Sequence, residues 1–71
     1  MDSIDQVVEI DYTNWRGERF KRRIIPKRLI WGHNEWHTES QWLLNAFDLY
    51  QREMRTFAMA SIHSWTPTRP E

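Results

Sequence analysis

The sequence predicts a small, mainly β fold built from antiparallel strands that pair into a small barrel. Residues 8–12 alternate apolar and acidic side chains, and a period of two is typical of a half-buried strand. Residues 41–48 form a short apolar run between polar turns, which favours a strand over a helix. A second run of mixed apolar and polar residues at 54–59 follows after a short polar gap, as expected for a pair of neighbouring strands.

The strands of the first half follow one another through turns. The first, at residues 8–12, ends at a turn in which Gly17 permits the positive φ of a tight hairpin. The return strand is expected over about residues 18–25. Pro26 marks the end of this strand or a sheet edge, because proline cannot donate a hydrogen bond to a neighbouring strand. A third short strand is expected over residues 28–31.

The second half begins with a polar connection that leads to the apolar strand at residues 41–48. A turn at residues 49–53 leads to the next strand, at 54–59. Residues 60–65 are compatible with a helical turn or with a last strand. The composition of residues 41–60 also tolerates a helix, and this alternative stays open.

Length and composition limit the chain to one small core. A domain of 71 residues buries only roughly 60% of the surface of its unfolded chain. We expect one domain over residues 1–65 and a flexible tail over 66–71, where prolines resist regular structure. The sequence has no cysteine, which fits a reducing compartment. It has neither a run of about 20 apolar residues nor a signal peptide, so we expect a cytoplasmic protein without membrane contact.

A formal net charge of zero hides an uneven distribution of charge. Seven of the ten lysines and arginines lie in one short stretch: Arg16, Arg19, Lys21, Arg22, Arg23, Lys27 and Arg28. The preceding strand is acidic. A basic strand of this kind either pairs with acids on its neighbour or offers a surface to an anion or a nucleic acid, and both interpretations stay open.

Catalysis and metal binding find little support in the sequence. No serine lies in a recognisable nucleophile motif, and two glycines are too few for a glycine-rich phosphate loop. His33 and His37 have the spacing of metal ligands on a helix, but they lie in a segment that we predict to be a loop. We therefore predict no enzyme activity, no cofactor and no metal.

Several aromatic residues are candidates for binding. Trp15 lies in a predicted turn and Trp36 in the long polar connection, so both rings are expected to be exposed. Exposed rings of this kind can form a partner surface or a platform for a base. Tyr12 can stack on a base or hydrogen-bond to a phosphate, or it can be a tyrosine at the rim of the fold.

Several short motifs follow one another between Val8 and Ile62. Tyr12, Gly17, the basic run 21–26 and Leu29 come first, and residues 42–48, residues 55–57 and Ile62 come after them. In this order and spacing, the two groups resemble the first and the second half of a WYL domain. Two features depart from the family pattern: Leu43 replaces the middle tyrosine of the name motif, and the connection at residues 32–41 is longer and richer in Trp and His than the usual hairpin.

The resemblance implies an Sm-like or SH3-like β-barrel of about five strands that acts as a sensor. Such modules are usually attached to a DNA-binding helix-turn-helix segment in bacterial transcription regulators. They are thought to bind nucleotides or short nucleic acids on a basic, aromatic-lined face. The sequence shows no DNA-binding segment ahead of the match, so we expect a stand-alone module of phage or mobile-element type.

The candidate ligand-binding residues are Tyr12, Arg22, Arg23, Arg28 and Arg55. Among them, Arg22 or Arg23 and Arg55 are the positions that match basic residues of the family. Arginine suits a phosphate because its planar fork can grip two oxygens. Because neighbouring side chains alternate across a strand, Arg22 and Arg23 cannot both face the ligand. We favour Arg23 and expect it to lie beside Arg55.

Two functions follow from these patterns. In the first, the protein is a non-enzymatic regulatory module that binds a nucleotide or a short single-stranded nucleic acid on its basic face. In the second, it is a protein–protein interaction module or inhibitor that docks a partner through Trp15 and Trp36. Self-association into a homodimer that covers a strand edge is compatible with the second function.

Overall fold

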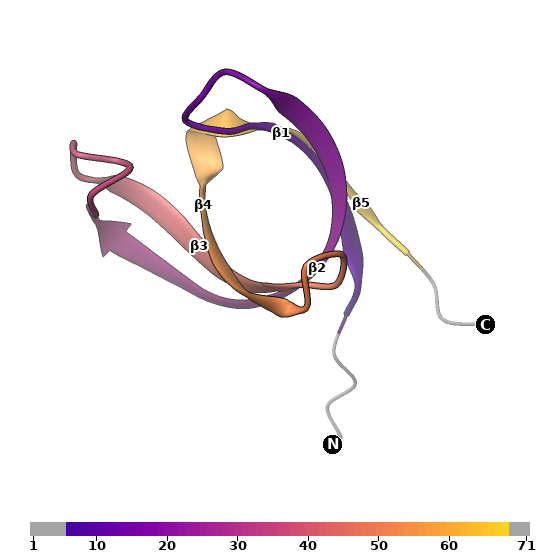
Figure 1. The fold of residues 1–71 in the computed structure, drawn as a ribbon. Helices are drawn as coiled ribbons and strands as arrows, with labels where there is room; N and C mark the ends of the chain where they lie inside the picture. Colours follow the sequence, from indigo (N-terminus) through magenta and orange to yellow (C-terminus); the bar gives the residue numbers. More distant parts are fainter. Residues whose placement is uncertain (1–5, 69–71) are drawn as a thin grey trace.

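The computed structural model describes residues 6–68. Its elements, in chain order, are β1 (Val8–Thr13), β2 (Arg19–Gly32), β3 (Gln41–Asp48), β4 (Glu53–Ala58), the 3-10 helix η1 (Met59–Ser61) and β5 (Ile62–Pro67). The strands pair antiparallel in one sheet of order β4-β3-β2-β1-β5 (Figure 1). The mainly β class and the five strands are confirmed. The helical alternative for residues 41–60 is wrong, because β3 and β4 occupy that segment.

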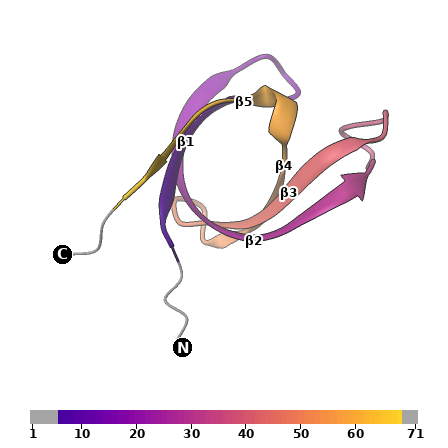
Figure 2. The ribbon, with the colours of Figure 1, turned by 180° about the vertical axis from the view of Figure 1, so that it is seen from behind.

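The sheet curls strongly on itself. Figure 1 shows the ribbon bending through most of a ring, and Figure 2 shows the same curl from behind. In the sheet order, β4 and β5 are the two edges and are not hydrogen-bonded neighbours. The described sheet is therefore strongly curled but not closed into a barrel between these two edges, and the expected Sm-like or SH3-like barrel stays a prediction.

Strand β2 is one continuous element of 14 residues, where the sequence predicted two strands separated at Pro26. The register against β3 shifts at this point, from the pair Pro26 and Ala46 to the pair Arg28 and Asn45. Lys27 is thus the additional residue of a β-bulge. A bulge accommodates a proline inside a strand and bends the strand. Because of this bend, β2 follows the curl of the sheet while its first part pairs with β1 and its second part with β3.

Strand β5 extends beyond the expected domain boundary. Thr66 pairs with Glu9 and Pro67 with Val8, so the first two residues of the predicted tail belong to the sheet. Proline fits there because an edge strand needs backbone donors on one side only. Residues 69–71 of the predicted tail lie outside the described residues. The preceding segment, residues 60–65, contains both the end of η1 and the beginning of β5.

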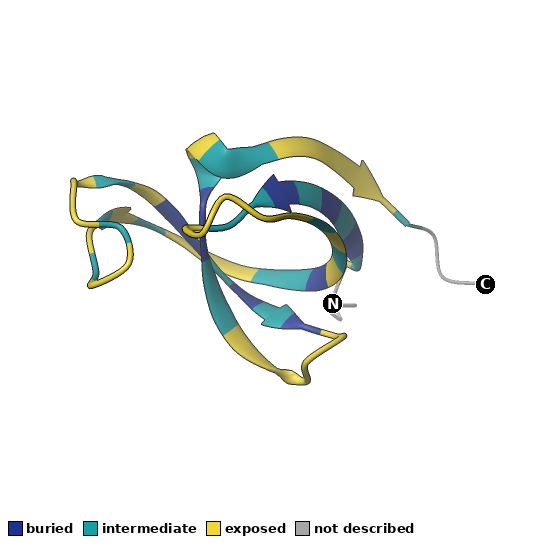
Figure 3. Ribbon diagram, turned by 45° about the horizontal axis from the view of Figure 1, so that its top comes forward, coloured by how far each residue is buried: buried dark blue, intermediate teal, exposed yellow. Residues whose placement is uncertain are grey.

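The core lies inside the curl. Its buried residues are Val8, Ile10, Tyr12, Ile24, Leu44, Ala46 and Phe57, with Phe20, Met59 and Ile62 packed against them. Alternate residues of β1 point into this core, as the period of two predicted. Figure 3 shows that exposed residues gather in the hairpin connections and along β5. The hairpin connections and β5 are therefore the most exposed parts of the described residues.

Candidate ligand-binding cleft

Arg23 and Arg55, which we expected side by side, lie on opposite faces of the sheet. Ile24 pairs with Asp48, and Asp48 pairs with Glu53. Paired residues share a face, and side chains two positions apart return to it, so Arg55 lies on the face of Ile24. Arg23 precedes Ile24 and faces the other way. The expectation that Arg23 lies beside Arg55 is therefore wrong, and the reason is that the register relating β2 to β4 cannot be read from the sequence.

Arg22 shares the face of Arg55 but lines a different hollow. Its guanidinium carbon lies 4.6 Å from the ring centroid of Phe20 and 4.3 Å from that of Tyr50. Its Nη1 donates a hydrogen bond of 3.0 Å to the backbone oxygen of Lys21. This small hollow of about 310 Å³ is lined by Glu9, Lys21, Arg22, Arg23, Leu49 and Tyr50. Arg22 and Arg23 thus line one hollow together, without Arg55.

A larger cleft of about 650 Å³ lies between the β1–β2 turn, the β2–β3 connection and β4. Residues 12–15, 34–37 and 54–58 line it. A volume of this size is typical of sites for small molecules. The cleft unites four residues that the sequence assigned to two separate sites: Tyr12, Trp15, Trp36 and Arg55.

Two stacked tryptophans form one wall of the cleft. The ring centroids of Trp15 and Trp36 are 4.9 Å apart and their planes differ by 25°. Both rings remain more than half exposed, as the sequence predicted. The guanidinium carbon of Arg16 lies 5.3 Å from the Trp15 centroid. The pair is a preformed flat aromatic surface, which we call the tryptophan platform.

An asparagine fixes each of the two loops that carry the platform. The Oδ1 of Asn14 accepts hydrogen bonds from the backbone N–H groups of Arg16 and Glu18. The Oδ1 of Asn34 accepts them from Trp36 and from the histidine that follows it. Asparagine stabilises turns through such bonds to the backbone. The platform therefore rests on two loops with fixed geometry.

Arg55 lies in the cleft beside a buried carboxylate. Its Nη1 is 3.6 Å from Oδ2 of Asp48, whose side chain is fully buried, whereas the Arg55 side chain is 31% exposed. The Oδ1 of Asp48 accepts hydrogen bonds from the backbone N–H groups of Tyr50 and Gln51. The distance to Arg55 exceeds that of a hydrogen bond. Asp48 thus keeps Arg55 in place by charge while its other oxygen holds the β3–β4 turn.

Tyr12 belongs to the core as much as to the cleft. It is 5% exposed, and its ring packs edge to face on Phe57 with centroids 4.9 Å apart. A ring packed in this way cannot serve as an open stacking platform. Arg28, the remaining residue of the predicted set, is exposed, pairs with Asn45 and lines neither cavity.

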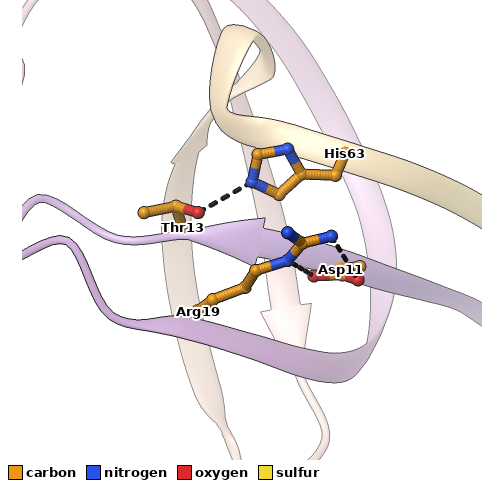
Figure 4. Close-up of polar contacts among 4 residues, drawn as sticks. All are labelled: Asp11, Thr13, Arg19 and His63. Carbon is orange, nitrogen blue, oxygen red and sulfur yellow. Dashed lines mark hydrogen bonds and ion pairs between the residues drawn. The ribbon is translucent and has the colours of Figure 1, made fainter.

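An ion pair between β1 and β2 lies outside the cleft (Figure 4). Arg19 donates from Nε to Oδ1 of Asp11 over 2.9 Å and from Nη2 to Oδ2 over 3.1 Å. These hydrogen bonds lower the pKa of the Asp11 carboxyl and raise the pKa of Arg19. A further hydrogen bond of 2.7 Å joins Thr13 Oγ1 and His63 Nε2, which links β1 to β5. The basic strand is thus paired in part with acids on its neighbour, one of the two interpretations of its charge.

Within residues 6–68, no three His, Asp or Glu side chains are grouped closely enough to hold a metal ion. In the same residues, no helix is long and apolar enough to cross a membrane. The cleft itself offers stacking on the tryptophan platform and positive charge from Arg55, and Glu35 and His37 also line it.

These features define a small antiparallel β module with an aromatic cleft that contains one arginine. The sequence model of the WYL domain matches residues 4–67, and the chain belongs to the WYL domain family. WYL domains are generally regulatory, ligand-binding modules, are associated with regulators that sense ligands or nucleic acids, and are not typically catalytic. No curated protein and no solved structure matches the chain significantly.

Three residues that support the cleft were not singled out from the sequence: Asn14, Asn34 and Asp48. Two of them, Asn14 and Asp48, carry a signal that could have revealed them. Asn14 precedes Gly17 by three residues, a pattern typical of tight turns, and Asp48 ends an apolar strand just before a turn. Side chains at such positions often accept hydrogen bonds from the turn backbone.

Proposed function

We propose that this protein is a non-enzymatic regulatory module that binds a nucleotide or a short single-stranded nucleic acid in the cleft. One observation carries the proposal: the tryptophan platform and Arg55 line the same cleft of about 650 Å³. Stacking of a base on an aromatic ring contributes about 1–3 kcal/mol, and arginine binds phosphate through its planar fork. The platform would hold the base while Arg55 binds the phosphate.

The departure at Leu43 is compatible with this function. Leu43 is 1% exposed and is not among the residues that line the cleft. Replacement of the family tyrosine by leucine therefore changes a buried position and leaves the cleft wall as it is.

The proposal extends to the fold and to the place of action. It takes the curled sheet to be an Sm-like or SH3-like barrel. It places the protein in the cytoplasm of a bacterium or of a phage-infected cell, where it regulates transcription.

The alternative function, docking of a protein through Trp15 and Trp36, receives less support. The two rings stack on each other and line a concave site, an arrangement that suits a small flat ligand better than a broad protein surface. Trp31 on β2 and Trp42 on β3 form another exposed aromatic surface, outside the cleft, which suits a protein contact better.

Binding of a labelled short single-stranded oligonucleotide, followed by fluorescence anisotropy, tests the proposed function. We expect weak binding that adenosine monophosphate displaces, because the cleft holds one base and one phosphate. If Arg55 is the main phosphate contact, the Kd should rise only about threefold between about 50 and 200 mM salt. Absence of binding at the lower salt concentration would contradict the proposal. A much steeper dependence of the Kd on salt would indicate that the oligonucleotide binds to the basic strand instead of the cleft.

A further inference from the structure

The cleft of the proposed function contains a carboxylate as well as a cation. Among the described residues that line it, Glu35 is the one acid and Arg55 is the one arginine or lysine. Arg55 lies on β4 and forms its ion pair with the buried Asp48, whereas Glu35 lies in the connection between β2 and β3. The two opposite charges therefore reach the cleft from different walls and are not paired with each other.

A closed turn positions Glu35 next to the tryptophan platform. The Oδ1 of Asn34 accepts hydrogen bonds of 2.9 and 2.7 Å from the backbone N–H groups of Trp36 and His37. The N–H of Asn34 donates to the backbone oxygen of His37 over 2.9 Å, so Glu35 is held in this turn directly before Trp36. Glu35 is exposed, and within residues 6–68 no hydrogen bond or ion pair engages its carboxylate. The carboxylate is therefore available to a ligand.

We propose that the cleft selects guanine nucleotides, because Glu35 binds the edge of a base that stacks on the platform. In the proposed function, on which this selection rests, the platform holds the base and Arg55 the phosphate, and the edge of the base is left for Glu35. Guanine carries two neighbouring donors, the ring N1–H and the 2-amino group, which can meet both oxygens of one carboxylate. Adenine and cytosine each place a ring-nitrogen acceptor beside their amino group, so one of the two contacts is lost.

The distribution of charge in the cleft matches a guanine nucleotide at both of its ends. The phosphate lies at one end of such a ligand and the two N–H donors at the other, and the cleft offers a cation and a carboxylate from separate walls. Because Glu35 is exposed, water competes for its oxygens and weakens the contact. We expect guanosine monophosphate to bind about fivefold more tightly than adenosine monophosphate. Inosine monophosphate should lie between them, because its base keeps N1–H and lacks the 2-amino group.

Calorimetric titration with guanosine, inosine and adenosine monophosphate tests the selection in the wild-type protein, in Glu35→Gln and in the control Glu39→Gln. Glu39 lies in the same connection, is exposed and lines neither cavity, so both variants lose one negative charge from one segment. In Glu35→Gln the ratio of the guanosine and adenosine affinities should fall to about one, because an amide pairs with adenine as well as with guanine. Glu39→Gln should keep the fivefold ratio. A general effect of the lost charge strengthens all three nucleotides alike and does not change the ratio.

Equal affinities of the wild-type protein for guanosine and adenosine monophosphate would overturn the selection and leave the proposed function in place. A preference that survives in Glu35→Gln, or that is lost equally in Glu39→Gln, would show that Glu35 does not read the base. Absence of binding by all three nucleotides would overturn the proposed function and the selection with it. Circular dichroism establishes beforehand that both variants are folded.

Discussion

Replacement of Arg55 by alanine is expected to weaken nucleotide binding about thirtyfold, a loss of about 2 kcal/mol. Arg55 is the arginine that lines the cleft with the tryptophan platform, and hydrogen bonds between charged groups are the stronger ones. Arg55→Lys should bind with intermediate affinity, because it keeps the charge but loses the planar fork. The measurement is a titration with adenosine monophosphate by calorimetry.

Arg23→Ala is the matched control. Arg23 lies on the opposite face of the sheet from Arg55 and lines only the small hollow, so its loss should leave the affinity for the mononucleotide unchanged. Arg55→Ala also leaves the buried carboxylate of Asp48 without its counter-charge. The double variant Asp48→Asn with Arg55→Gln removes both charges together and should still lose binding. Equal losses in the Arg23 and Arg55 variants would argue against the cleft.

Asp48→Ala is expected to cause a large loss of stability, about 3 kcal/mol in the free energy of unfolding. The Asp48 side chain is fully buried and holds the N–H groups of Tyr50 and Gln51. Alanine would leave both donors without this acceptor and Arg55 without its counter-charge. For a domain of this size, the loss corresponds to a fall of more than about 10 °C in Tm, which thermal and urea denaturation followed by circular dichroism can measure.

Asp48→Asn separates the two roles of this side chain. The amide oxygen of asparagine can still accept the two backbone hydrogen bonds, so we expect this variant to lose only about 1 kcal/mol. If asparagine destabilised the protein as much as alanine, the charge opposite Arg55 would carry the whole effect. An Asp48→Ala protein as stable as the wild type would refute the supporting role of Asp48.

The fold was largely predictable because its strands carry strong local patterns. Alternation over residues 8–12 identified β1, and the short apolar run identified β3. Pro26 was misinterpreted because a proline ends most strands but is accommodated in a bulge, and only the neighbouring strand determines which occurs. Pro67 was placed in a tail for a similar reason, since sequence does not reveal that β5 is an edge.

The candidate site was predictable as individual residues but not as an arrangement. Composition and turn position indicated Trp15 and Trp36, and the family pattern indicated Arg55. Their union in one cleft depends on the curl of the sheet, which brings the β1–β2 turn near the β2–β3 connection. The choice between Arg22 and Arg23 depends on register across three strands, because a shift of one residue reverses every face. Local sequence carries little information on either feature.

The central claim, that the tryptophan platform and Arg55 bind one ligand together, is tested most directly by nuclear magnetic resonance. The five tryptophans report on three places during titration with adenosine monophosphate: the stacked pair Trp15 and Trp36, the pair Trp31 and Trp42, and Trp65 on β5. We predict that the indole signals of Trp15 and Trp36 and the Nε signal of Arg55 shift together, while those of Trp31, Trp42 and Trp65 stay in place. Shifts confined to Arg22, Arg23 and Tyr50, with the platform signals unmoved, would contradict the claim.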